Sequence, residues 1–173
     1  MDLPHGRIDA GGPEAERLVA LPATWFGEVL EGLSDGRDAF ADRMVGALVR
    51  ESSAALDDPS SCTPDEVAWA LSLSLARRGL GLVAFERWGD ALVFVWRSAP
   101  ASGEAFRAFA SRLASRLVGE LFGLDVAGVT LAGEAAELRI ALLNPEASRG
   151  LRARAGEAIT SDAILALLTG DDA

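Results

Sequence analysis

The sequence predicts an α+β fold, in which two helix–strand–strand units form one four-stranded antiparallel sheet. Between residues 63 and 143, apolar residues change twice from helical spacing to the alternation typical of strands. The residues expected at helix ends and turns also recur 44 residues later. Gly79-Leu80 matches Gly123-Leu124, and Gly89-Asp90 matches Gly133-Glu134. Duplication of one unit and chance similarity of two amphipathic units both explain this recurrence. We expect helices before the first unit and a helical segment after the second.

The N-terminal part is expected to hold a flexible arm and then two helices. Residues 1–20 are polar and rich in Gly and Pro, so we expect a loose arm that ends in a short helical turn. Residues 21–173 are expected to form a single α+β domain. Gly36 closes the first helix, and the second begins near Asp38. Their apolar stripes are, in order, Trp25, Phe26, Val29, Leu30 and Leu33, and then Phe40, Met44 and Leu48.

The first unit opens with the clearest local signal in the chain. Thr63-Pro64-Asp65-Glu66 combines a capping box with a proline at the first helical position and acids at the positive end of the helix. We expect this helix to stop at Gly79. Two segments rich in Val, Phe and Trp follow, at Leu82–Arg87 and Ala91–Arg97, which predicts a hairpin.

The second unit repeats this order. Helical spacing predicts a long helix over Glu104–Phe122, and a second hairpin is expected from about Val126–Ala132 and Ala136–Leu143. Asn144 has the character of a helix start. A short terminal helix is expected over Ser161–Leu168.

Composition excludes several classes of function. The 173 residues carry a net charge of −10, which argues against nucleic acid or an anionic membrane as a partner. Residues 1–60 hold 12 acids against 5 Arg, which indicates either a solvated outer layer or a surface that meets a basic partner. We see no signal peptide and no apolar run that could span a membrane, so we expect a cytoplasmic protein. A periplasmic location would need a route that the sequence does not reveal.

The inventory of reactive side chains is poor. The chain has one Cys, Cys62, and one His, His5, so it offers neither a disulfide nor four zinc ligands of the N and S type. Gly32-Leu33-Ser34-Asp35-Gly36 matches G-x-S-x-G, but a helix precedes the serine and His5 is the only base, so we interpret it as a helix stop and turn. Glu86 could face a packed layer or an exposed strand face. We therefore expect no catalytic residues, no cofactor and no metal site.

Exposed aromatic side chains are the remaining candidates for function, because they anchor interfaces. We predict an interface that draws on Trp25, Phe26, Val29, Trp69 and Trp88. Trp96 is expected in the core.

Residues 38–143 resemble the D subunit of bacterial cellulose synthase. The resemblance lies in Cys62–Glu66, the apolar helix, Gly79–Glu86, the hairpin and the loop Ser98–Gly103. That family forms a closed oligomer that guides glucan chains beside the synthase. The resemblance implies a non-enzymatic, self-associating accessory subunit, whose partners are other copies of itself, another protein subunit or a glucan chain.

Two other families look similar in layout. The order of elements resembles the 4-vinyl reductase-type ligand-binding domain, a relative of the transport protein particle subunits, which implies a sensory domain with an apolar pocket between helices and sheet. That family has a Cys-rich motif where this chain has Ala132–Ala136, which contains no cysteine. Type III secretion chaperones share the acidity, the size and the helix–strand–strand units, which implies an acidic protein that binds a partner protein.

Overall fold

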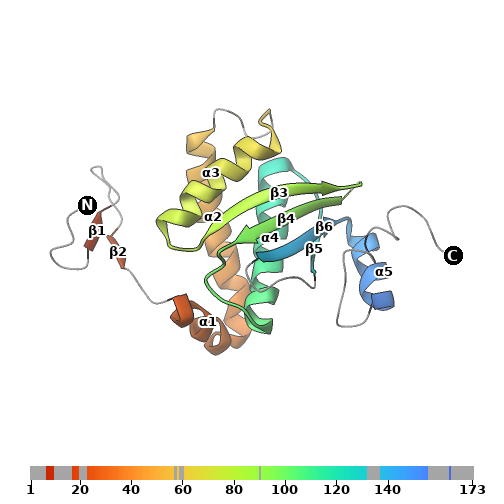
Figure 1. Cartoon of the computed structure of the whole chain (residues 1–173), viewed down its shortest axis with the longest axis horizontal. Coiled ribbons are helices and arrows are strands. Elements are labelled where there is room, and N and C mark those ends of the chain that lie inside the picture. Colours follow the sequence, from red (N-terminus) through yellow and green to blue (C-terminus); the bar gives the residue numbers. More distant parts are fainter. Residues whose placement is uncertain are drawn as a thin grey trace.

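The chain folds as an α+β domain whose elements follow the predicted order (Figure 1). The computed structural model describes residues 7–9, 17–19, 23–56, 58, 61–89, 91–131, 137–155 and 164. The helices are α1 (Ala23–Gly32), a 3-10 turn η1 (Ser34–Gly36), α2 (Arg37–Ala55), α3 (Pro64–Arg77), α4 (Glu104–Phe122) and α5 (Pro145–Ala155). The strands are β1 (Arg7–Asp9), β2 (Arg17–Val19), β3 (Leu82–Trp88), β4 (Ala91–Arg97), β5 (Ala127–Thr130) and β6 (Glu137–Leu143).

The two helix–strand–strand units share one antiparallel sheet, as the sequence predicts. The strand order is β3-β4-β6-β5, so each unit contributes one central strand and one edge strand. The units meet where β4 pairs with β6, with Phe94 opposite Ile140 and Trp96 opposite Leu138. Because side chains alternate across a strand, these pairs fix which face of the sheet meets the helices.

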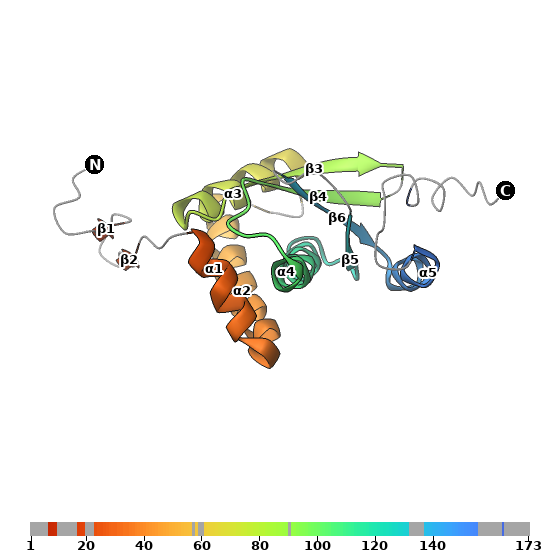
Figure 2. The same ribbon diagram turned by 60° about the horizontal axis from the view of Figure 1, so that its bottom comes forward.

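The main core lies between the sheet and the helices (Figure 2). Helices α3 and α4 pack against the sheet, and α2 packs against both of them. Trp96 is fully buried, as expected, and its indole Nε1 donates a 2.5 Å hydrogen bond to the carbonyl oxygen of Leu80. Its ring lies 5.3 Å from that of Phe106, in a tilted arrangement. This network of large side chains fills the space between the two layers.

The opposite face of the sheet is covered in part by the C-terminal segment. Leu151 of α5 and the helical Ile164 are buried against Val129, Ala141 and Leu143. Asn144 begins α5 as predicted, since its Oδ1 accepts a 2.7 Å hydrogen bond from the backbone N–H of Ala147. Apart from Ile164, the expected helix over Ser161–Leu168 lies outside the described residues.

The N-terminal segment differs from the expectation. Where we expected a loose arm with a short helical turn, β1 and β2 form an antiparallel ribbon in which Ile8 pairs with Leu18. The expected helical turn was wrong for Arg17–Val19, because the backbone there pairs with another strand. Within the described part of the chain, no helix combines the length and the apolar character needed to cross a bilayer.

Candidate interaction surface

Two of the reactive side chains that the sequence offers, Cys62 and Ser34, lie on separate segments of the described chain. Among the described residues, no three His, Cys, Asp or Glu side chains come together as metal ligands. Cys62 is half-buried, and its Sγ donates to the carbonyl oxygen of Asp58 at 3.2 Å. His5 lies outside the described residues. Ser34 opens the 3-10 turn directly after α1, so the G-x-S-x-G pattern is a helix stop rather than a strand-to-helix elbow.

The outer face of α3 carries the most exposed large apolar side chain of the described residues. Trp69 is 62% exposed, and Leu73, one turn further on, is 38% exposed. Both lie there because α3 buries the stripe of Val67, Leu71 and Leu75, which leaves these two positions on the opposite side of the helix. We call Trp69, Leu73 and the charged residues at either end of this stripe the α3 face.

Opposite charges occupy the two ends of the α3 face. Asp65 and Glu66 lie in the first turn of α3, and Arg77 lies in the last turn. This arrangement complements the helix dipole, whose positive end is at the N-terminus. It also gives the exposed apolar stripe an acidic end and a basic end.

The α3 face is held rigidly at both ends. The Thr63 hydroxyl accepts from the Glu66 backbone N–H at 3.3 Å, and Glu66 Oε2 accepts from the Thr63 backbone N–H at 2.8 Å. These hydrogen bonds from Thr63, the backbone one foremost, lower the pKa of Glu66 below its ordinary range. At the other end Arg78 forms a forked ion pair with Glu51 of α2, in which Nη1 lies 2.7 Å from Oε2. Arg78 also donates to the carbonyl oxygen of Ser74 at 2.9 Å.

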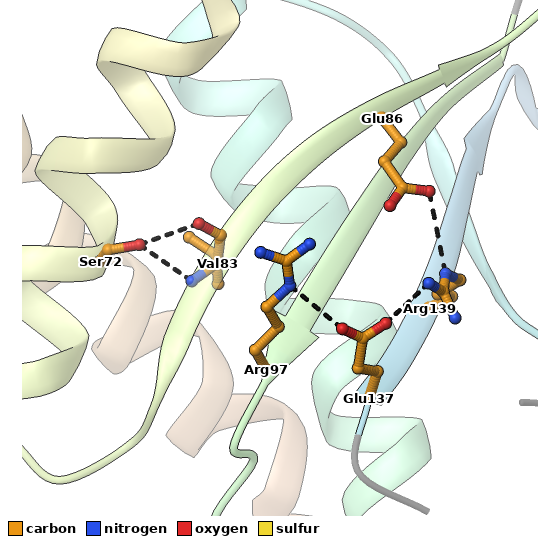
Figure 3. A network of polar contacts seen from close by, with 6 residues as sticks. All are labelled: Ser72, Val83, Glu86, Arg97, Glu137 and Arg139. Atoms are coloured by element: carbon orange, nitrogen blue, oxygen red, sulfur yellow. Dashed lines mark hydrogen bonds and ion pairs between the residues drawn. The ribbon is translucent and has the colours of Figure 1, made fainter. Parts of the chain in front are cut away.

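A serine joins α3 to the edge of the sheet (Figure 3). The Ser72 hydroxyl donates to the carbonyl oxygen of Val83 and accepts from its backbone N–H, both at 2.9 Å. Val83 lies on β3, an edge strand, and these backbone groups point away from β4. The Ser72 contact therefore closes the edge of β3 at this position and fixes α3 against it.

The open face of the sheet carries a network of paired charges, also drawn in Figure 3. Glu137 accepts from Arg97 at 3.1 Å and forms an ion pair with Arg139 at 2.6 Å. Arg139 Nε lies 3.8 Å from Glu86, which also accepts from the indole N–H of Trp88 at 3.1 Å. Glu86 thus lies on the face away from the helices.

This network covers apolar side chains rather than forming a reactive pair. Val93 and Val95 of β4 are fully buried on that face of the sheet. They lie opposite Glu86 and Arg139, respectively, in the strand register. The aliphatic stems of long charged side chains can bury such residues while the charged ends stay in water.

A groove runs along the other edge of the sheet, between α4 and β5. It encloses about 720 Å³. Its walls are Val126–Thr130 on the strand side and one stripe of α4, which includes Ala108, Ser111 and Ser115, together with Asp38 of α2. Ser111 donates to the carbonyl oxygen of Gly128 at 2.8 Å, so a serine of the neighbouring helix contacts this edge strand too.

The five residues of the predicted interface lie on three different elements. Trp69 and Trp25 are exposed, the latter at 49%, but they belong to α3 and α1. Phe26 and Val29 are half-buried, and the Phe26 ring lies 5.7 Å from the core ring of Phe109. Trp88, at the end of β3, is half-buried against the cluster beneath α5.

Sequence reasoning missed Leu73 and the groove. Leu73 could have been found from its position, because it lies two residues before Leu75 of the buried stripe and four residues after Trp69. On a helix this spacing places Leu73 beside Trp69, away from the buried stripe. The groove had no such signal, because it forms where α4 meets a strand that follows it in the chain and a residue of α2.

No protein-family model matches the chain, and no curated protein matches it either.

Proposed function

We propose that this protein is a non-catalytic, self-associating accessory subunit, and that two copies meet through the α3 face. The observation that carries the proposal is the exposure of Trp69 beside Leu73 on a helix fixed at both ends. Tryptophan is enriched among the residues that dominate binding energy at interfaces. A rigid helix loses little conformational entropy when it binds.

The pattern of the α3 face is self-complementary. A two-fold axis that crosses α3 at the level of Leu71 reverses the direction of the helix in the second copy. Trp69 of one copy then lies opposite Leu73 of the other, because both residues are two positions from Leu71. The same operation brings the acidic end of one helix, at Glu66, to the basic end of the other, at Arg77.

The charge of the whole chain makes this local match important. Two copies that each carry −10 repel one another, and that repulsion opposes any association that is not locally complementary. The paired helix ends offset part of it. A contact between single helices buries less than the roughly 1,600 Å² of a standard interface, so we expect a dissociation constant in the micromolar range or weaker.

The packing between helices and sheet favours this function over ligand sensing. A sensor of an apolar ligand would need space between the two layers. That region is filled by Phe94, Trp96 and Phe106, which are packed ring against ring. The role in guiding glucan chains is an implication of the resemblance to the cellulose synthase subunit, and we propose it only as one setting for such an accessory subunit.

Sedimentation velocity over a range of concentrations tests the proposal. We expect the wild-type protein to self-associate, and Trp69→Ala to weaken association by more than about tenfold. Trp25→Ala is the matched control, because it removes an exposed tryptophan from α1 instead. Arg77→Glu should also weaken association, since it sets two acids against each other. A wild-type protein that stays monomeric, or equal effects of Trp69→Ala and Trp25→Ala, would contradict the proposal.

A further inference from the structure

We infer that the C-terminal segment is an autoinhibitory latch: through Ile164 it covers the open face of the sheet, and its release lets that face bind the same face of a second copy. The open face is the side of the sheet that turns away from the main core. It is a different surface from the α3 face, so the inference does not depend on the proposed function. It concerns which surfaces of the protein are available for association.

One row of opposed residues runs across the whole open face. Glu86 of β3 lies opposite Val93 of β4. Val93 in turn lies opposite Ala141 of β6, which lies opposite Val129 of β5. Directly opposed residues share one face of a sheet, so these four side chains form a row. The three apolar members are all buried, at 2% exposure or less, which means that this face is covered along most of its width.

The two halves of the row are covered in different ways. Toward β3 the cover is the network of paired charges, in which Glu86 lies beside Arg139. Toward β5 the cover is Leu151 of α5 together with Ile164, which is fully buried in the small apolar cluster on β5 and β6. The charged side chains belong to the strands themselves, whereas Ile164 reaches the sheet from the C-terminal segment.

The cover over β5 and β6 can open without disturbance of the main core. The cluster that contains Ile164 is separate from the cluster between the sheet and α2, α3 and α4. Helix α5 follows β6 directly and is capped by Asn144, but Ile164 lies nine positions after Ala155, the last residue of α5. Separate clusters open as units of their own, at a lower free energy than the whole domain. Ile164 is therefore the contact of the open face that is released most easily.

The distribution of charge explains why release favours a second copy. Residues 156–173 hold four acids and no basic residue, so the segment that Ile164 anchors repels another copy, which carries a charge of −10. The network on the open face is instead balanced, with two glutamates against Arg97 and Arg139. Two open faces without their acidic segments meet with no local excess of charge. Apolar residues between two antiparallel sheets then form a shared core, as in a β-sandwich.

Ile164→Asp in the full-length protein tests the latch. An aspartate enters the apolar cluster only with the loss of its hydration, so the segment is released. The burial of one isoleucine is equivalent to a factor of about ten or more in an equilibrium constant, so we expect at least about tenfold tighter self-association in sedimentation velocity. Ile164→Val keeps most of the apolar contact and should associate as the wild type does. Ile164→Asp that associates no more than the wild type would overturn the inference.

Amide hydrogen exchange and a synthetic peptide separate release of the latch from misfolding. In Ile164→Asp, exchange should become faster in α5 and stay unchanged in α3. A peptide of residues 156–173, added to this variant, should occupy the released site and reverse the extra association. The same peptide with Ile164→Asp is the control and should have no effect. Faster exchange throughout the chain, or association that the wild-type peptide does not reverse, would contradict the latch.

The Trp69→Ala background keeps this inference apart from the proposed function. The extra association caused by Ile164→Asp should persist in the double variant, because the open face does not include Trp69. If Trp69→Ala abolishes the extra association, that association uses the α3 face, and the latch over the open face is wrong. If Trp69→Ala has no effect in either background, the proposed function is wrong, and the persistent association of Ile164→Asp supports the latch.

Discussion

Replacement of Gly128 by alanine is the most informative change to the contact between β5 and α4. A Cβ added at Gly128 would lie 2.6 Å from the backbone oxygen and 2.7 Å from the hydroxyl of Ser111, and 2.9 Å from the hydroxyl of Ser115. Real Cβ atoms essentially never approach other atoms so closely, and the nearest atom here is backbone, which cannot rotate away. The strand must therefore move away from α4.

The loss of stability can be estimated from the contacts that this movement breaks. The hydrogen bond from Ser111 to Gly128, 2.8 Å long, contributes about 1 kcal/mol. Overpacking of a fixed contact costs about 1–3 kcal/mol. The smaller entropy of the unfolded chain offsets about 0.4–1 kcal/mol. We expect Gly128→Ala to destabilise the protein by about 1–4 kcal/mol, which corresponds to a lower Tm by several degrees for a domain of this size.

Gly46 provides the matched control. It lies within α2, and a Cβ there would meet only the end of the Arg50 side chain, at an ordinary 3.5 Å. Since alanine favours helix over glycine, Gly46→Ala should stabilise by about 0.5–1 kcal/mol. Urea unfolding followed by tryptophan fluorescence and circular dichroism measures both variants. If Gly128→Ala is as stable as the wild type, or if the two variants shift in the same direction, the close approach of β5 and α4 is not as described.

Two further predictions concern α3 and its contact with α2. Thr63→Ala removes the N-terminal cap of α3 and should destabilise the protein by about 1 kcal/mol in urea unfolding. Thr63→Ser keeps the hydroxyl, so its loss of stability should be much smaller. Equal losses of stability in the two variants would argue against the cap. The hydrogen bond from Arg78 lowers the pKa of Glu51, so the stability that this carboxylate contributes is complete above the unfolded pKa of about 4.3 and disappears as pH falls through the lower folded value. The difference in unfolding free energy between the wild type and Glu51→Gln should therefore shrink toward pH ~3, and a difference that is constant with pH would exclude the ion pair as its source.

The elements of the two units could be predicted from sequence because local chemistry fixes their ends. The helix predicted over Glu104–Phe122 is observed with these bounds, and Gly123 ends it with a φ of 67°, in the left-handed region. The capping box at Thr63 is likewise present in full. Such signals act between residues three or four positions apart, so a single sequence displays them.

The location of the surfaces could not be predicted, because it depends on contacts between distant residues. The residues around Phe26 do not show whether its side chain is exposed or buried. It contacts Phe109 because α1 packs against α4, and these helices are far apart in the sequence. Trp69 stays exposed, in contrast to Phe26, since nothing in the described chain covers the outer side of α3. The ribbon of β1 and β2 could not be predicted, because three-residue strands are too short to display an alternating pattern.

The two units differ where their helices meet the sheet edges, and that difference bears on the α3 face. Gly79 and Gly123, which lie 44 residues apart, have the same φ of 67° after α3 and α4, so the backbones turn alike. On the α3 side, Ser72 engages both the N–H and the C=O of Val83, and the strand edge is closed there. On the α4 side, Ser111 contacts the carbonyl oxygen of Gly128, and an open groove extends beside Thr130.

An edge closed by its own helix cannot accept another strand at that position, so association on the α3 side must use the outer surface of the helix. Ser72→Ala frees the N–H and C=O of Val83, so it should open the β3 edge and increase nonspecific association in sedimentation velocity. If Ser72→Ala associates no more than the wild type, the serine is not what closes the edge of β3.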